Sequence, residues 1–276
     1  MSKRRWYVGT SGYQYRHWRG VFYPPEMPAR RWLGWYASVF RSVEINNTFY
    51  GLPSPDTVAA WRDAVPAGFR FALKFSRYGS HVRRLRDPAD ILHRFVQAIA
   101  PLGKKTGPIL VQLPPHWHFD GRRLAGFLRA LPGEYEWVME FRDPDWLRDE
   151  CFEMLERAGV SLCMHDLMEN HPWVVTGNVV YLRFHGTGYG GTYPHQLLAA
   201  CADRLSREIR LGRCAHAYFN NDADGFAPRD AGRLARFLAA RLGERPPPRA
   251  GRDYGRAGPA SERRPLQAGK HRQPAQ

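Results

Sequence analysis

Side chains that can ionise or form strong hydrogen bonds recur in this sequence directly after short apolar runs. Glu44, Lys74, Glu140 and Arg183 each end such a run, where burying an unpaired charge would cost several kcal/mol. These side chains must therefore pair with one another or face water and a ligand. The whole set is Glu44, Asn46 and Asn47, Lys74 with His81, Gln112, Glu140 and Arg142, His165 and Asp166, Arg183 and His185, and Asn220, Asn221 and Asp222.

The residue types in this set support three kinds of chemistry. Guanidinium, ammonium and imidazole groups favour an anion pocket, because guanidinium forks match phosphate or carboxylate oxygens. Carboxylates serve acid/base catalysis or bind a hard cation, and histidines bind a transition metal or carry protons. The predicted catalytic residues are Glu44, Glu140, Asp166, His185 and Asp222. The predicted substrate-binding or anion-binding residues are Lys74, His81, Arg142, Arg183, Asn46, Asn221 and Gln112.

A metal cofactor is left open by the sequence. No H-E-x-x-H or other fixed metal-ligand spacing is present. A divalent metal site would therefore have to be assembled from several of these run ends in the folded chain. An internal salt-bridge network that only ties the run ends together is the structural alternative.

The elements that carry these residues alternate along the chain. Short β-branched or aromatic runs are followed by longer segments of helical period, and strands recur eight times. The predicted strands are residues 7–9, 42–45, 69–74, 108–113, 137–140, 160–164, 179–184 and 215–219. The predicted helices are residues 30–38, 56–64, 87–100, 121–130, 145–158, 195–211 and 229–242. Asn170, His171 and Pro172 break the pattern after the sixth strand, so no helix is predicted there.

Helices that connect successive strands imply a parallel sheet. Eight such units in about 240 residues predict an α/β fold, a single TIM-type (β/α)₈ barrel. An open doubly wound sheet is the alternative, but Gly9-Thr10-Ser11-Gly12 lacks the G-x-G-x-x-G spacing typical of it. The C-terminal strand ends of a parallel barrel meet at one rim, so we expect the functional residues to lie together there.

The 276-residue chain has a globular composition and a strongly basic balance, with a net charge of +15. This charge favours an anionic neighbour such as nucleic acid or a phosphorylated small molecule. Residues 244–276 contain eight basic, three acidic and six proline residues, which leaves +10 for residues 1–243. We therefore predict a barrel domain over residues 1–243 and a disordered basic Pro/Arg-rich tail over residues 244–276.

Cysteine usage and the absence of long apolar runs indicate the cellular setting. The four cysteines have no C-x-x-C spacing, and the chain opens with Met1-Ser2-Lys3 rather than with an apolar leader. No apolar stretch approaches the ~18 residues of a membrane helix. We expect a soluble, cytoplasmic protein without a membrane partner, whose oligomeric state the sequence does not fix.

Two further segments each allow a structural and a functional interpretation. Seven aromatic residues in the first 23 positions form either a hydrophobic lid or a stacking surface for bases or sugars. They are Trp6, Tyr7, Tyr13, Tyr15, Trp18, Phe22 and Tyr23. The glycine-rich segment 186–193 after the seventh strand is either a phosphate-binding loop or a mobile lid.

Several phrases at the strand ends resemble the YecE-like family, the domain of unknown function numbered 72. The phrases are Gly9-Thr10-Ser11-Gly12-Tyr13 with Trp18 and Phe22-Tyr23-Pro24, Val43-Glu44-Ile45-Asn46-Asn47-Thr48-Phe49-Tyr50, Gln112-Leu113-Pro114-Pro115, Glu140-Phe141-Arg142, Tyr181-Leu182-Arg183-Phe184-His185-Gly186 and Tyr218-Phe219-Asn220-Asn221-Asp222. The resemblance spans residue 7 to about 240 and implies a TIM-type barrel. It implies no particular reaction.

The mixed charges at the strand ends favour an enzyme of the hydrolase type that acts on a phosphate-bearing or nucleic-acid substrate. Lys74, Arg142 and Arg183 would hold the anion. A carbohydrate-active enzyme with Glu44 and Glu140 as its carboxylate pair is the first alternative. A non-catalytic nucleic-acid-binding protein, whose affinity comes from the basic tail and body, is the second.

Overall fold

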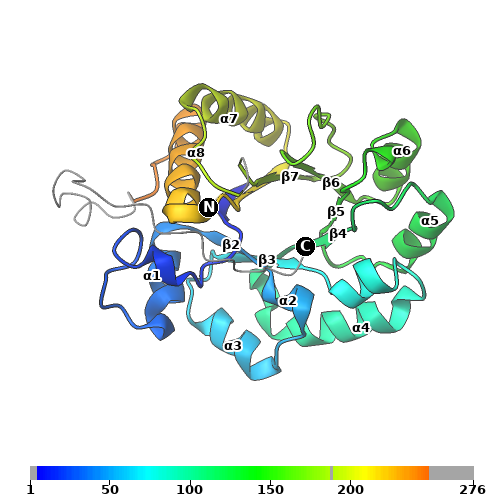
Figure 1. Cartoon of the computed structure of the whole chain (residues 1–276), viewed down its shortest axis with the longest axis horizontal. Helices are drawn as coiled ribbons and strands as arrows, with labels where there is room; N and C mark the ends of the chain where they lie inside the picture. The colour runs from blue at the N-terminus through cyan, green and yellow to red at the C-terminus, as the bar shows by residue number, and fades with distance from the viewer. Residues whose placement is uncertain (1–4, 187–188, 249–276) are drawn as a thin grey trace, which may run out of the picture.

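The fold is a parallel barrel. The computed structural model describes residues 5–186 and 189–248. Its eight strands run in the order β1-β8-β7-β6-β5-β4-β3-β2, with all neighbours parallel. The strands are β1 (Trp6–Thr10), β2 (Ser42–Ile45), β3 (Arg70–Lys74), β4 (Thr106–Gln112), β5 (Trp137–Glu140), β6 (Ser161–His165), β7 (Val179–Phe184) and β8 (Cys214–Phe219). The predicted (β/α)₈ barrel is confirmed (Figure 1).

The barrel closes between β1 and β2, where Ser11 and Glu44 form a parallel bridge. A Cβ at Gly9 would lie 2.1 Å from the backbone oxygen of Ser42, so only glycine allows the two strands this close. The Tyr36 hydroxyl fills part of the seam. It accepts a hydrogen bond from the Thr10 amide at 2.8 Å and donates one to the Ser42 oxygen at 3.0 Å.

Helices surround the strands as the hydrophobic periodicity predicts (Figure 1). They are α1 (Trp32–Val39), α3 (Pro55–Asp63), α4 (Pro88–Ile99), α5 (Gly121–Ala130), α6 (Asp149–Arg157), α7 (His195–Arg210) and α8 (Phe226–Leu242). A short helix, α2 (Asn47–Tyr50), follows β2 directly and was not predicted.

The predicted helix over residues 145–158 is interrupted near its start. A 3₁₀ turn (Pro144–Trp146) comes first, and α6 begins only at Asp149. The Asp143 carboxylate accepts from the Asp145 amide at 3.0 Å, and Leu147 then leaves the helical region with ψ at 65°. A local side-chain cap therefore separates the two elements.

No helix joins β6 to β7 in the described part of the chain, as the Asn170-His171-Pro172 break predicts. The irregular segment 166–178 is anchored instead by side-chain hydrogen bonds to the backbone. Thr176 Oγ1 donates to the Val160 oxygen at 2.7 Å, and Ser161 Oγ accepts from the Val179 amide at 3.2 Å. The ring of helices is open between α6 and α7, where this segment lies (Figure 1).

The strands divide their side chains between two regions. The main core lies between strands and helices, and a smaller cluster fills the barrel interior. That inner cluster consists of Ala72, Leu110, Val138, Cys163, Val179, Tyr181 and Tyr218. Because side chains alternate along a strand, the residue two positions further on also points to the barrel axis. Those residues are Lys74, Gln112, Glu140, His165, Arg183 and Asn220, so one end of the barrel interior is polar.

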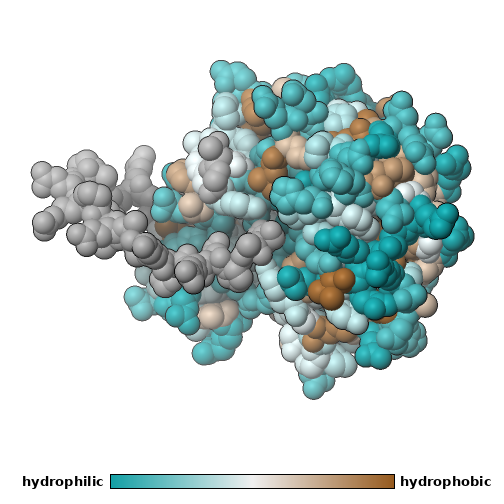
Figure 2. Space-filling model, turned by 45° about the vertical axis from the view of Figure 1, so that its right-hand side comes forward, coloured by the Kyte–Doolittle hydropathy of each residue, from teal (hydrophilic) through white to brown (hydrophobic). Residues whose placement is uncertain are grey.

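The end of α8 marks where the predicted tail begins. Gly243 caps the helix with φ at 65°, and Trp6 Nε1 donates to Glu244 Oε2 at 3.1 Å. The remainder of the predicted tail, residues 249–276, lies outside the described residues. None of the described helices is long and apolar enough to cross a membrane. The face drawn in Figure 2 is largely hydrophilic, with separate small hydrophobic patches.

Candidate functional site

Arg183 is the centre of the polar end of the barrel. Its side chain is almost completely buried and lies between two buried carboxylates. Arg183 Nη2 donates to Glu44 Oε1 at 2.8 Å, and Nη1 donates to Glu140 Oε2 at 2.8 Å. Strands β2, β5 and β7 are thus joined by one guanidinium group. An anionic ligand of Arg183, as the sequence predicts, would have to compete with the two carboxylates that already pair with it.

The other oxygens of the two carboxylates are also occupied. Tyr181 donates to Glu44 Oε2 at 2.7 Å, and Gln112 Nε2 donates to Glu140 Oε1 at 2.7 Å. Arg142 Nε donates to the same Glu140 oxygen. Burial alone would raise the pKa of Glu140, but the charges of Arg142 and Arg183 outweigh it and hold this pKa well below its usual value. Glu140 therefore stays ionised at neutral pH.

A second cluster joins Asp166 to His185 beside this network. Asp166 Oδ1 lies 3.2 Å from His185 Nδ1 and accepts from the His185 amide at 2.8 Å. Tyr193 donates to Asp166 Oδ2. Burial would raise the pKa of Asp166, but the hydrogen bonds from His185 and Tyr193 lower it to about 2. An ionised Asp166 places the proton of His185 on Nδ1.

The other ring nitrogen of His185, Nε2, is able to act as a base. Nε2 is buried and has no hydrogen-bond partner among residues 5–186 and 189–248. Burial lowers the pKa of His185 below 6.5, so the imidazole is neutral at pH 7 and Nε2 carries a lone pair. An imidazole oriented by a carboxylate, with a free nitrogen, is the arrangement of a general base.

Lys74 and His81 lie together around Phe49. Lys74 Nζ is 4.1 Å from the centroid of the Phe49 ring, and the His81 ring meets the same ring edge-on at 5.0 Å. Burial, followed by the charge of Arg183, lowers the pKa of Lys74 to about 7. Burial and the nearby Lys74 lower the pKa of His81 to about 4. The predicted cation Lys74 is therefore only partly charged at neutral pH.

A small rim cavity of about 170 Å³ opens beside these clusters. His81, Gln112, Arg142 and Tyr189 supply its polar lining. The Tyr189 ring also contacts the His185 ring edge-on at 5.6 Å, so one residue of the cavity lining touches the Asp166–His185 pair. Arg142 is anchored through Nε, and no hydrogen bond to its Nη groups is found within the described ranges. Those two groups are free to bind a planar or tetrahedral anion.

The remaining predicted residues are distributed around the rim. Asn46 Nδ2 donates to Ser11 Oγ at 2.9 Å, which links it to Glu44. Asn221 Nδ2 donates to Asp230 Oδ2 at 3.0 Å and belongs to the base of α8. His165 Nε2 contacts the Phe141 carbonyl at 2.8 Å, so it positions β5 against β6.

Asp222 lies apart from the two glutamates and binds the N-terminal aromatic segment. Trp18 Nε1 donates to Asp222 Oδ1 at 2.7 Å, and His17 Nε2 lies 3.3 Å from Asp222 Oδ2. Six of the seven aromatic residues in that segment are buried, with Tyr15 the partly exposed one. Most of these rings therefore pack in the protein interior, Trp6 and Tyr7 as part of β1, and they do not form an open stacking surface.

The possible divalent metal that the sequence left open finds no donor set among the rim residues that the structure describes. No group of three or more histidine, cysteine, aspartate or glutamate side chains in the described part of the chain has a metal-holding geometry. Glu44 and Glu140 are neutralised by arginine, and Asp166 is bound to His185 and Tyr193. The described side chains at the rim therefore do not fit a metal ion.

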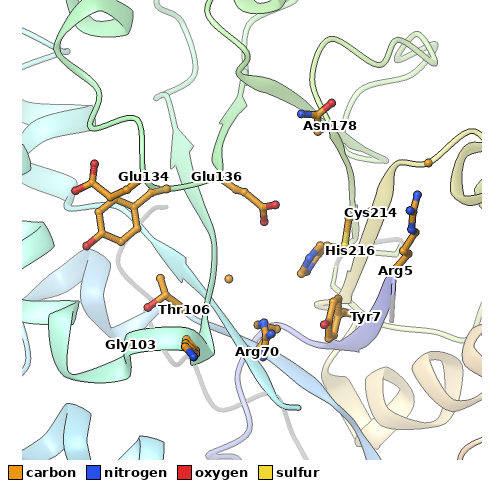
Figure 3. Close-up of a pocket in the computed structure, with 14 residues that line it drawn as sticks. Arg5, Tyr7, Arg70, Gly103, Thr106, Glu134, Glu136, Asn178, Cys214 and His216 are labelled. Carbon is orange, nitrogen blue, oxygen red and sulfur yellow. The ribbon is translucent and has the colours of Figure 1, made fainter. Parts of the chain in front are cut away.

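A larger cavity, of about 850 Å³, lies at the opposite mouth of the barrel. Arg5, Tyr7, Arg70, Glu136 and His216 are among its lining residues (Figure 3). His216 is stacked on Tyr7 at 4.8 Å and bonded to the Tyr218 hydroxyl at 2.9 Å. Residues at the N-terminal strand ends stabilise a barrel, whereas its chemistry occurs at the C-terminal ends. We therefore place the candidate site at the rim, despite the smaller volume there.

Comparison with known proteins gives the family. The family model described as "Protein of unknown function DUF72" matches residues 7–252. The chain belongs to this family. The curated Escherichia coli K12 protein named UPF0759 protein YecE is 38% identical over 114 residues, which are 40% of this chain and 41% of that protein. The chain thus aligns with about two fifths of that relative's length.

A second curated relative is UPF0759 protein YunF of Bacillus subtilis strain 168. It is 23% identical over 206 residues, which cover 67% of this chain and 71% of that protein. A crystal structure of a DUF72 family protein from Thermotoga maritima is 28% identical, with a TM-score of 0.76, covering 87% of this chain and all of that one. An Enterococcus faecalis family member, 21% identical with a TM-score of 0.73, shares the fold over 84% of this chain and 95% of that one. The YecE-like resemblance is confirmed.

The geometry brings most of the predicted site residues to one rim and adds several that were not predicted. Tyr181, Tyr193 and Ser11 hold the carboxylates of Glu44 and Asp166. Tyr181 lies two positions before Arg183, so strand alternation would have placed it in the barrel interior. Ser11 ends the run of β1, and no comparable pattern marks Tyr193.

Proposed function

We propose that this protein is a hydrolase that cleaves a phosphate ester of a small molecule at the rim cavity. The observation that carries the proposal is the His185 imidazole, held by Asp166 on one nitrogen and unpartnered on the other. A base in this state can remove a proton from water as the water attacks phosphorus, while the ester P–O bond breaks and the departing alkoxide receives the proton back from the imidazolium. Asp166, ionised throughout the neutral range, stabilises the imidazolium that results.

Arg142 supplies the anion contact in this mechanism. Glu140 fixes its Nε, so that the two Nη groups are pre-oriented toward the cavity that Arg142 lines. Pre-placed donors of this kind stabilise the charge that develops on phosphoryl oxygens without reorganisation. Gln112 and His81 line the same cavity and would contact the remaining oxygens. A volume of about 170 Å³ suits a phosphate and a short carbon chain.

The geometry disfavours the carbohydrate hypothesis with Glu44 and Glu140 as its carboxylate pair. A glycosidase needs one carboxyl group protonated as general acid. The pKa of Glu140 is held well below its usual value, and Arg183 lies between the two carboxylates. Binding of nucleic acid by the basic tail is a separate proposal, which concerns mostly residues outside those described.

Turnover tests the proposal. The full chain should release inorganic phosphate from a panel of small phosphomonoesters, and p-nitrophenyl phosphate gives a continuous assay. Because the pKa of His185 is lowered, the neutral base should persist through pH 7, and the rate should fall only as the pH drops through that lowered pKa, below 6.5. Activity that rises as the pH falls from 7 to 5, or no phosphate release from any ester, would contradict it.

A further inference from the structure

Lysine is rare in this chain, and one lysine has an unusual position. Of the 41 basic residues, five are lysines (Lys3, Lys74, Lys104, Lys105 and Lys270) and 36 are arginines. Arginine cannot lose its proton under physiological conditions, whereas a buried lysine can. Lys74 is the lysine at the C-terminal end of a barrel strand, in a rim whose other cations, Arg142 and Arg183, are arginines. A permanent cation at this position would not require lysine.

The surroundings of Lys74 leave its amine without an ionic partner. The side chain is 6% exposed, and no ion pair to it is found within residues 5–186 and 189–248. The neighbouring carboxylates Glu44 and Glu140 are already paired with Arg183 and Arg142. Its Nζ instead faces the Phe49 ring at 4.1 Å. Thr48 Oγ1 donates to the Lys74 carbonyl at 2.7 Å and fixes the strand end.

Burial and the positive charge of Arg183 both favour the neutral amine, and they lower the pKa of Lys74 to about 7. Glu140 and Glu44 oppose this shift, and Arg142 adds to it. A substantial fraction of the Lys74 amine is therefore neutral at pH 7, whereas an ordinary lysine, with a pKa of about 10.4, is almost fully protonated. A neutral amine carries the lone pair that a nucleophile needs.

A histidine that lines the rim cavity lies near this amine. His81 contacts the same Phe49 ring as Lys74 and lines the cavity, so it connects the Lys74 cluster to the rim cavity. Ser80 Oγ lies 2.9 Å from His81 Nδ1 and orients the ring. Burial, followed by the charge of Lys74, lowers the pKa of His81 to about 4, so the ring is neutral at pH 7 and adds no positive charge beside the amine.

We propose that Lys74 is a covalent nucleophile, which forms an imine with the aldehyde or ketone group of a small substrate. The Nζ lone pair attacks the carbonyl carbon, and the C=O π electrons move to oxygen, which takes up the proton that nitrogen loses. The resulting hydroxyl group then leaves as water with a second proton, and a C=N bond forms. Amine and carbonyl thus give imine and one water, and no oxidant or reductant is consumed.

This inference extends the proposed function, because a phosphate held by Arg142 would make the substrate a phosphorylated aldehyde or ketone. Imine formation itself needs no phosphate. The two claims can therefore be tested separately with glycolaldehyde and glycolaldehyde phosphate, which carry the same carbonyl group and differ in the phosphate.

The full chain is incubated at pH 7 with glycolaldehyde and sodium cyanoborohydride, which reduces an imine to a stable secondary amine. Peptide mass spectrometry then follows modification at each of the five lysines. We expect Lys74 to be modified at least about tenfold faster than Lys104, because more of its amine is neutral than in an ordinary lysine. The variant Lys74→Arg should lose this fast modification, and the matched control Lys104→Arg should retain it.

Modification of Lys74 no faster than Lys104, with the fold intact by circular dichroism, would overturn the inference. The experiment with glycolaldehyde phosphate tests the phosphate site independently. Glycolaldehyde phosphate should modify Lys74 faster than glycolaldehyde does, and Arg142→Ala should remove only this advantage. Fast modification by glycolaldehyde with no advantage for the phosphate would support the nucleophile and contradict the phosphate site.

Discussion

Replacement of Arg183 by methionine is expected to lower the free energy of unfolding by about 3–5 kcal/mol at pH 7, because it leaves buried charges without their partner. Arg183 donates at 2.8 Å to both Glu44 and Glu140, and both carboxylates are fully buried. Methionine keeps an unbranched apolar stem, but it is shorter than arginine and supplies no charge. Urea unfolding followed by circular dichroism measures the loss.

The pH dependence of this loss has a definite sign. Glu140 has a lowered pKa in the folded protein, so its ion pairs stabilise the fold above the unfolded-state pKa, and this stability is lost as the pH falls through the folded-state pKa. In Arg183→Met the buried Glu140 loses one of the two arginine charges that lower its pKa, so it takes up a proton at higher pH. The difference from the wild type should therefore shrink as the pH is lowered from 7 to 4.

Arg94→Met is the matched control for Arg183→Met. Arg94 pairs with Asp90, but their side chains are 71% and 68% exposed, so its removal should change stability by less than about 0.5 kcal/mol. Equal effects of the two substitutions would show that the Arg183 network contributes no more than a surface pair.

Replacement of His185 by glutamine is expected to lower kcat for phosphate-ester hydrolysis by about 10²–10⁴-fold, the usual contribution of a general base. Glutamine keeps the approximate size and a hydrogen bond to Asp166, but it cannot accept the proton of water. KM should change little, because the anion contacts come from Arg142 and Gln112. Initial rates over a range of substrate concentrations separate the two constants.

His93→Gln controls for the loss of an imidazole elsewhere, because His93 is exposed on α4. Asp166→Asn should also lower kcat, because an amide no longer stabilises the imidazolium or fixes its tautomer. A His185→Gln variant with wild-type kcat would remove the general base from this mechanism, whatever the stability of the protein.

The fold could be predicted from the sequence because the patterns of the strands and of the helices agreed with one another. The same barrel was indicated by three features: strands of about five residues, helices with apolar residues at steps of four, and the break at Asn170-His171-Pro172. The rim location of Glu44, Lys74, Glu140 and Arg183 followed from their positions at strand ends, since a parallel barrel gathers those ends. The short helix α2 (Asn47–Tyr50) consists of a single turn, which is too short for hydrophobic periodicity to predict a helix.

Which charged side chains pair with one another at the rim could not be predicted from the sequence. Sequence assigned Arg183 to the anion pocket together with Lys74 and Arg142, but the three cations differ in their surroundings. Arg183 is paired with two carboxylates, Arg142 is held by one, and Lys74 has none within the described residues. These differences arise from strands β2, β3, β5 and β7 meeting around one axis. The spacing of these residues along the chain does not show which charges lie next to one another at that axis.

Phosphate binding by the rim cavity tests the central claim most directly. Isothermal titration of the full chain with inorganic phosphate should give one site, and Arg142→Ala should weaken it by about 10–100-fold, the effect of losing a charged hydrogen-bond pair. Arg122→Ala, an exposed position on α5, should leave the affinity unchanged. No measurable phosphate binding by the wild type, or equal affinity in Arg142→Ala and the wild type, would contradict the account.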